Sequence, residues 1–188
     1  ETHIAGTHLL DPESGIYNLP DVRRTLPQTP VVLVHLTERE QGLLVLRGNP
    51  KAIGGLKDLD RRDIQFVNRQ PGSGTRVLLD YELKRLGIDP HSIHGYNREE
   101  FTHMAVGVAV ASGLADTGLG VRAAAQALGL DFIPVASEPY DLLFQRAFFE
   151  GERGAELVQV IRSEAFKRAV SALGGYDTAS AGQIRYHQ

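Results

Sequence analysis

Hydrophobic and polar positions change their spacing along the chain, and this spacing separates candidate strands from candidate helices. Short runs of apolar or small residues predict strands at residues 2–7, 31–36, 42–46, 93–96, 115–120, 132–135 and 140–146, with another opening at residue 64. Runs with a helical repeat predict helices at residues 22–26, 56–59, 102–112, 122–128, 152–161 and 164–173. Strands that alternate with helices favour an α/β fold with a mixed, mostly parallel sheet.

The clearest unit in this pattern runs from residue 64 to residue 87. It reads as a short strand, a turn of Gly, Ser and Thr, and an amphipathic helix that ends at Gly87. The turn gathers the free N–H groups of a helix start and the hydroxyls of Ser73 and Thr75, where the helix dipole favours negative charge. We therefore predict an oxyanion site there, with an ordinary helix cap as the alternative. No Lys precedes the Ser/Thr pair and a third glycine is missing, so a P-loop and a dinucleotide fingerprint are both disfavoured.

Composition narrows the class of protein. The 188 residues are 42% hydrophobic and 23% charged, which is typical of a soluble globular chain with one large domain or two small lobes. A net charge of −3 without a Lys/Arg run gives no attraction for nucleic acid. The chain has no Cys, and its seven His lack metal-ligand spacing, so we expect no metal site. No apolar run of about 18 residues and no leader pattern is present, so we expect no membrane contact and a cytoplasmic location.

Four segments together resemble one protein family. They are residues 5–12 (AGTHLLDP), 68–76 (NRQPGSGTR), the Thr-His pair at 102–103, and 138–141 (EPYD). The family is the periplasmic-binding-protein-like domain attached to molybdate-responsive helix-turn-helix regulators and to molybdopterin biosynthesis proteins. The pattern is also similar to molybdate- and tungstate-binding proteins of the type II fold.

The resemblance implies two α/β lobes with a ligand in the cleft between them. With crossing segments near 44–48 and 134–139, lobe I would be residues 1–46 with 140–188, and lobe II would be 47–139. Members usually begin with a further strand, a helix and a Gly-Ser turn, so the resemblance implies that a first strand and helix are lacking. An open sheet edge would remain, and because such an edge invites pairing with another chain we expect a homo-oligomer or a swapped arrangement.

Residue chemistry and the resemblance together give a set of candidate ligand contacts that all carry N–H or O–H donors: Thr7, His8, Arg69, Ser73, Gly74, Thr75, Arg76, Thr102, His103 and Tyr140. A neutral imidazole donates one hydrogen bond and a protonated one donates two, so His8 and His103 suit an anion. Each is equally compatible with a buried, satisfied histidine. Arg69 and Arg76 would close on a dianion by bidentate bonds, and a structural ion pair is the alternative for Arg69.

Three hydroxyl groups among these candidates have competing roles. Thr7 and Tyr140 would donate into the cleft, with turn capping and aromatic packing as their alternatives. The role of Thr102 depends on where its helix begins, because Asn97 and Glu100 fit a capping box that would start the helix earlier. We expect Thr102 to be the cap, which would direct a second helix end at the ligand.

These observations predict a non-enzymatic domain that binds molybdate or tungstate and needs no cofactor. It would be the effector domain of a regulator or of a molybdenum-cofactor protein, with a DNA-binding or molybdopterin-biosynthesis domain elsewhere as its partner. Selection over sulfate or phosphate would rest on cavity size and on donor-only contacts. A module that binds a molybdopterin precursor and a ligand-free oligomerisation module are the alternatives. No Ser-His-Asp set or carboxylate pair is legible, so no catalytic residue is predicted.

Overall fold

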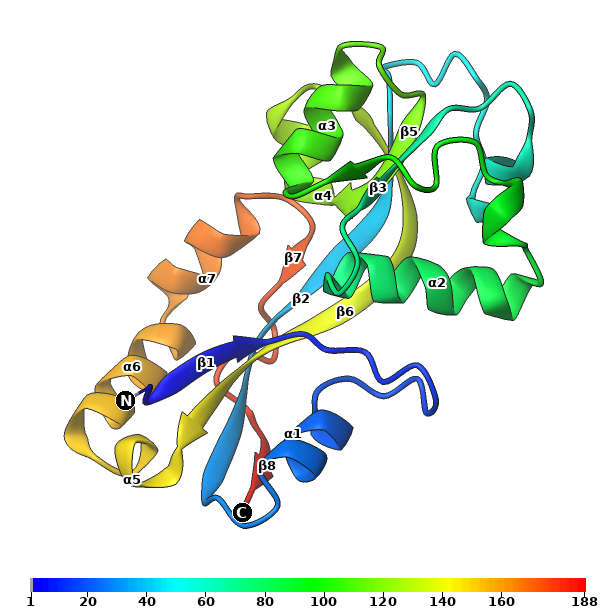
Figure 1. The fold of residues 1–188 in the computed structure, drawn as a ribbon. Helices are drawn as coiled ribbons and strands as arrows, with labels where there is room; N and C mark the ends of the chain where they lie inside the picture. Colours follow the sequence, from blue (N-terminus) through cyan, green and yellow to red (C-terminus); the bar gives the residue numbers. More distant parts are fainter. Residues whose placement is uncertain (1) are drawn as a thin grey trace. The chain divides into compact units, whose positions relative to one another are not determined.

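The computed structural model describes residues 2–188, and the chain divides into two compact units. Unit 1 is Glu1–Arg39 with Glu138–Gln188, and unit 2 is Glu40–Ser137. The chain changes unit inside two strands of 15 residues each, β2 (Val31–Val45) and β6 (Asp131–Gln145). Both strands are drawn as long arrows in Figure 1. The lobe boundaries and the crossing segments near 44–48 and 134–139 stay predictions.

The sequence pattern predicts two shorter strands in place of each of these long strands, with polar residues between them. That splitting is wrong, and the side chains of Arg39 and Glu138 explain why. Arg39 Nε donates to Glu138 Oε1, and the two residues are only 8% and 0% exposed. The charges are paired inside unit 1, so they do not require the solvent-exposed turn that charged residues usually indicate.

Unit 1 places helices and short strands around residues 31–39 of β2 and 138–145 of β6. Its other elements are β1 (Ile4–Thr7), α1 (Leu19–Thr25), α5 (Arg146–Phe149), α6 (Glu152–Arg162), α7 (Glu164–Ser171), β7 (Tyr176–Asp177) and β8 (Ile184–His187). β1 pairs antiparallel with β6, and β7 and β8 pair antiparallel with β2. β1 lies at one end of the strand order, so it is an edge strand. Pairing of this edge with another chain stays a prediction.

Unit 2 contains the parallel part of the fold. Its elements are η1 (Leu56–Asp60), β3 (Phe66–Arg69), α2 (Gly74–Leu86), η2 (Pro90–Ser92), β4 (Glu99–Glu100), α3 (His103–Ala111), β5 (Thr117–Val121) and α4 (Arg122–Ala127). β3 runs parallel to β4 and β5, while β5 runs antiparallel to β2. The sheet is mixed as expected, but antiparallel pairs outnumber parallel ones across the described registers, contrary to the mostly parallel prediction.

The strand predicted at 93–96 is also wrong, because this segment forms turns. Asp89 caps η2 by accepting from the His91 N–H at 2.9 Å, and Ile93 is the C-cap of η2. Gly95 then adopts a positive φ of 91°, with its Cα so close to the Phe66 carbonyl that no side chain fits. β4, one of the two strands that pair with β3, forms only after this turn.

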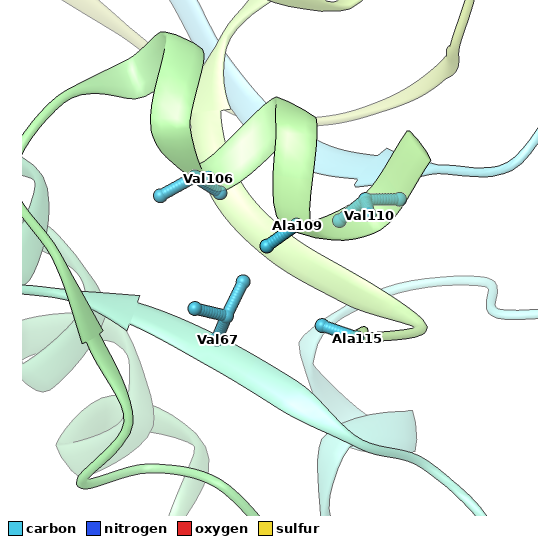
Figure 2. Close-up of a cluster of buried hydrophobic side chains, with 5 residues drawn as sticks. All are labelled: Val67, Val106, Ala109, Val110 and Ala115. Carbon is cyan, nitrogen blue, oxygen red and sulfur yellow. The ribbon is translucent and has the colours of Figure 1, made fainter. Parts of the chain in front are cut away.

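Small apolar side chains pack α3 closely onto β3 and β5. Figure 2 shows this cluster, whose members are Val67, Val106, Ala109, Val110 and Ala115. Gly118 on β5 completes the contact, since a Cβ there would lie 2.5 Å from Val106 Cγ1 and 2.7 Å from the Val67 carbonyl oxygen. The absent side chain at Gly118 therefore sets how closely α3 approaches the sheet.

Replacing Gly118 by Ala should destabilise the domain by about 1–3 kcal/mol, because the added methyl group overpacks this contact. In thermal melting the loss corresponds to a fall of roughly 2–4 °C per kcal/mol for a chain of this size. Gly55→Ala is the matched control, since Gly55 has extended backbone and no atom within 4 Å of a Cβ. Equal melting temperatures for the two variants would contradict the close contact.

Candidate functional site

Three helices of unit 2 begin at one edge of its sheet. Because β3, β4 and β5 are parallel and in register, their carboxyl ends lie together. The chain passes from these ends into α2, α3 and α4, respectively. In open α/β sheets, ligands bind outside the carboxyl ends of the strands. We call this region, from the ends of β3, β4 and β5 to the first turns of α2 and α3, the carboxyl edge.

The start of α2 leaves hydrogen-bond donors open at the carboxyl edge. Gly72 adopts a positive φ of 81° and Ser73 N–H returns to the Gln70 carbonyl at 3.3 Å, which forms a tight turn before the helix. Ser73 is the N-cap, and its Oγ accepts from Arg76 N–H at 3.2 Å. Within residues 2–188 the N–H groups of Gly74 and Thr75 have no acceptor, which is the usual state of a first helical turn.

Thr75 is joined to a residue that the sequence reasoning missed. Gln41 lies opposite Val121 in the β2–β5 ladder, so β2 places it at the carboxyl edge. Gln41 Nε2 donates to Thr75 Oγ1 at 3.1 Å, and the two residues are 0% and 2% exposed. The only signal in the sequence is a polar side chain directly before the apolar run that starts at Gly42.

The start of α3 confirms the prediction that Thr102 is the helix cap. Thr102 has extended backbone, and its Oγ1 accepts from Ala105 N–H at 3.0 Å. The alternative capping box does not form, because Glu100 belongs to β4. His103 opens the helix with its ring beside Gly120, where a Cβ would lie 3.7 Å from Nδ1. Ser73, Gly74, Thr75, Thr102 and His103 therefore all belong to the two helix starts at the carboxyl edge.

The two candidate arginines bind groups of the protein itself. Arg69 donates from Nε to the Glu100 carbonyl at 3.2 Å and from Nη2 to the Phe101 carbonyl at 3.0 Å. Because these carbonyls directly precede the Thr102 cap, Arg69 holds the start of α3 in place. Arg76 donates to the Asp80 carboxylate at 3.2 Å and stacks on the Tyr96 ring at 4.1 Å. These contacts favour structural roles for both arginines.

The Tyr96 phenol shares the Asp80 carboxylate with Arg76. Burial, followed by its hydrogen bond to Asp80, raises the pKa of Tyr96 above its usual value. The phenol therefore stays neutral and donates to Asp80, whose carboxylate also accepts from Arg76. The local charge of Arg76 is thus neutralised beside the start of α2.

The remaining candidates lie in unit 1. His8 and Tyr140 stack with ring centroids 5.3 Å apart, and the Arg39 guanidinium lies 5.2 Å from the Tyr140 centroid. Arg39 Nη2 lies 3.0 Å from His8 Nδ1, so the same guanidinium joins His8 to Glu138. Gly6 permits this packing, because a Cβ there would lie 2.5 Å from the Tyr140 hydroxyl. Aromatic packing, the alternative weighed for Tyr140, is thus present.

Thr7 belongs to a buried polar network in unit 1. Its hydroxyl donates to Asn18 Oδ1 at 3.0 Å, Asn18 Nδ2 donates to Asp141 Oδ2 at 2.7 Å, and Asp141 Oδ1 lies 2.8 Å from His35 Nδ1. Asn18 holds a rare φ of 63° with no exposed surface. Since the Thr7 hydrogen is directed to Asn18, this hydroxyl supports the loop before α1.

Within residues 2–188, no group of three or more His, Asp or Glu side chains is placed to hold a metal ion. None of the helices in the described part of the chain has the length and apolar character that a membrane crossing requires.

A family model described as the PBP superfamily domain matches residues 1–162. The chain belongs to the PBP superfamily. This confirms the resemblance at the level of the superfamily. The uncharacterized protein YvgK of Bacillus subtilis is 41% identical to this PBP-superfamily chain over 182 residues. The matched segment covers 96% of this chain. The chain spans only 58% of the length of that curated relative.

Solved structures share the fold of this PBP-superfamily domain. One is named as the substrate-binding domain of a molybdenum ABC transporter from Clostridium difficile, with a TM-score of 0.59, 13% identity, and coverage of 84% of this chain and 80% of that chain. Another is named as a phosphate ABC transporter substrate-binding protein with bound phosphate, from Clostridium perfringens. It has a TM-score of 0.63, 13% identity, and coverage of 94% and 79%. At this identity the likeness shows the α/β fold alone.

Replacing Thr102 by Ala should lower the free energy of unfolding by about 1 kcal/mol, because the Ala105 N–H loses its acceptor. Thr102→Ser keeps the hydroxyl and should remain within a few tenths of a kcal/mol of the parent. Chemical denaturation of both variants measures the difference. A Thr102→Ala curve that overlays the Thr102→Ser curve would show that the cap contributes nothing.

Proposed function

We propose that this domain binds a small tetrahedral oxyanion, molybdate or tungstate, at the carboxyl edge of unit 2. The observation that carries the proposal is the set of donors at the start of α2. It consists of the N–H groups of Gly74 and Thr75, which lack acceptors within residues 2–188, and the hydroxyls of Ser73 and Thr75. The start of α3, with Thr102 and His103, lies at the same edge.

The electrostatics of this edge favour a dianion held by neutral groups. Arg76 is paired with Asp80, and Arg69 is bound to backbone carbonyls, so neither guanidinium is required to face the ligand. The positive ends of the α2 and α3 dipoles then provide the favourable potential. At a site shielded from bulk water, such N–H and O–H groups bind an anion more strongly than they do in water.

The choice of ligand class also has support from proteins of the same fold. A structural neighbour is named for molybdenum transport, and another holds phosphate. Within this class we favour molybdate or tungstate, because the contacts at the start of α2 are donors and a protonated phosphate also needs an acceptor. The position of the ligand in a cleft between two lobes stays a prediction.

We further propose that the domain is a non-enzymatic sensor, the effector part of a larger regulator or molybdenum-cofactor protein. The PBP-superfamily membership supports a binding role. The greater length of YvgK is compatible with an additional domain in that relative. Ligand binding would act by favouring the conformation with the higher affinity for the anion.

Molybdate at a hundredfold excess over its dissociation constant should stabilise the domain by about 2.7 kcal/mol. The double variant Ser73→Ala/Thr75→Ala should lose this stabilisation, because both hydroxyl donors are removed. Thermal melting with and without molybdate measures the effect. Ser163→Ala is the matched control, since Ser163 caps α7 with the same 3.2 Å geometry and should leave the response to molybdate unchanged.

The same melting series with tungstate, sulfate and phosphate tests the class of anion. An undiminished response to molybdate in the double variant would rule out the start of α2 as the site. A parent protein that no anion stabilises would instead support the ligand-free oligomerisation module.

A further inference from the structure

The hydrogen bond between Gln41 and Thr75 has a direction. A hydroxyl both donates and accepts, so an isolated Thr can offer a ligand either its hydrogen or a lone pair. Here the hydroxyl oxygen accepts from Gln41 Nε2 at 3.1 Å. An amide N–H only donates, so the Thr75 hydrogen must be directed elsewhere, and within residues 2–188 it meets no acceptor.

Burial makes this direction persistent. Gln41 is fully buried and Thr75 is 2% exposed, so bulk water does not exchange freely with either group. A buried donor without an acceptor has a free-energy cost, which a bound acceptor would relieve. The Thr75 hydrogen therefore adds to the donors of Gly74 and Thr75 N–H at the start of α2.

The β2 strand determines that an amide rather than a carboxylate meets Thr75. Neighbouring side chains on a strand point to opposite faces, so Gln41 and Glu40 are separated by the sheet. Glu40 is paired with Arg122, whose Nη2 donates to Glu40 Oε1 at 3.0 Å. The carboxylate nearest to Gln41 in the sequence is thus committed to a cation on the other face.

We infer that Gln41 is a positioning residue that sets the anion specificity of this site by fixing the direction of the Thr75 hydroxyl. The inference rests on the proposed function and refines it. The carboxyl edge selects oxyanions that carry no proton, such as molybdate, tungstate and sulfate. It discriminates against oxyanions that keep a proton at neutral pH, such as phosphate, because their O–H would meet a donor instead of an acceptor.

The test compares dissociation constants for molybdate and phosphate, measured by titration calorimetry at mildly alkaline pH, where phosphate is mainly the HPO4²⁻ dianion and still carries one proton. In Gln41→Glu the carboxylate accepts the Thr75 hydrogen, so the hydroxyl offers a lone pair to the ligand. The added negative charge weakens both dianions, but this effect cancels in the ratio of the two constants. We expect the preference for molybdate over phosphate to fall by roughly tenfold or more.

Two further variants separate the hydroxyl effect from changes in folding. Gln41→Met keeps the size of the side chain but removes its polarity, and it should reduce the preference less than Gln41→Glu does. Adding Thr75→Val to Gln41→Glu should abolish the difference between Glu and Gln at position 41, since the hydroxyl that carries it is gone. If Gln41→Glu does not fold, Gln41→Met and Thr75→Val should each still lower the parent's preference.

The outcomes distinguish this inference from the proposed function. Molybdate binding with an unchanged preference in the Gln41 variants would overturn the role of Gln41 and leave the proposed function standing. A parent protein that prefers phosphate would also overturn it, because the hydroxyl would then be offering a lone pair. A parent protein that binds no oxyanion would remove both.

Discussion

Because β4 and β5 both run parallel to β3, the three strands end at one edge of unit 2, and the chain must leave that edge through a connection each time. These connections lead into α2, α3 and α4. Parallel pairing therefore brings N–H groups from distant parts of the sequence to one place without any charged side chain. Ser73 and Thr102 begin helices at the same edge for this reason, although 28 residues of sequence lie between them.

The charged side chains near the carboxyl edge bind other groups of the protein itself. Arg69 binds the carbonyls before α3, and Arg76 binds Asp80 and Tyr96. In unit 1, Arg39 and Glu138 pair with each other inside two long strands. Burying such charges is costly unless they are paired, so their geometry is determined by partners within the protein. The polar groups left for ligand chemistry are neutral.

Local sequence signals predicted the parts of the site that depend on local structure. Gly87 ends α2 in the left-handed conformation with φ 68°, Ser73 begins the helix, and Thr102 caps α3, as helix-end chemistry indicates. The membership in a binding-protein superfamily followed from short motifs. Gln41 was not predictable in this way, because its partner Thr75 is distant in sequence and meets it only through the β2–β5 ladder.

The wrong predictions, which divided β2 and β6 and placed a strand at 93–96, have the same physical origin. Polar residues in the middle of β2 and β6 suggested turns, since the sequence alone does not show that Arg39 and Glu138 neutralise each other. The segment 93–96 has strand-like residues, but Gly95 must pass against the Phe66 carbonyl and the chain turns there. In both cases a long-range contact overrides a local preference.

The close packing of α3 at Gly107 and Gly118 has a consequence for the thermodynamics of ligand binding. Gly107 and Gly118 let the helix sit where added methyl groups would meet Leu128, Val106 and the Val67 carbonyl. Close packing of this kind favours a single position of the helix, so the proposed anion would meet donors that the fold has already ordered. A small anion that forms only a few contacts can then bind with little further entropic penalty. Conversely, a single methyl group placed behind α3 would weaken that preorganisation without touching the ligand.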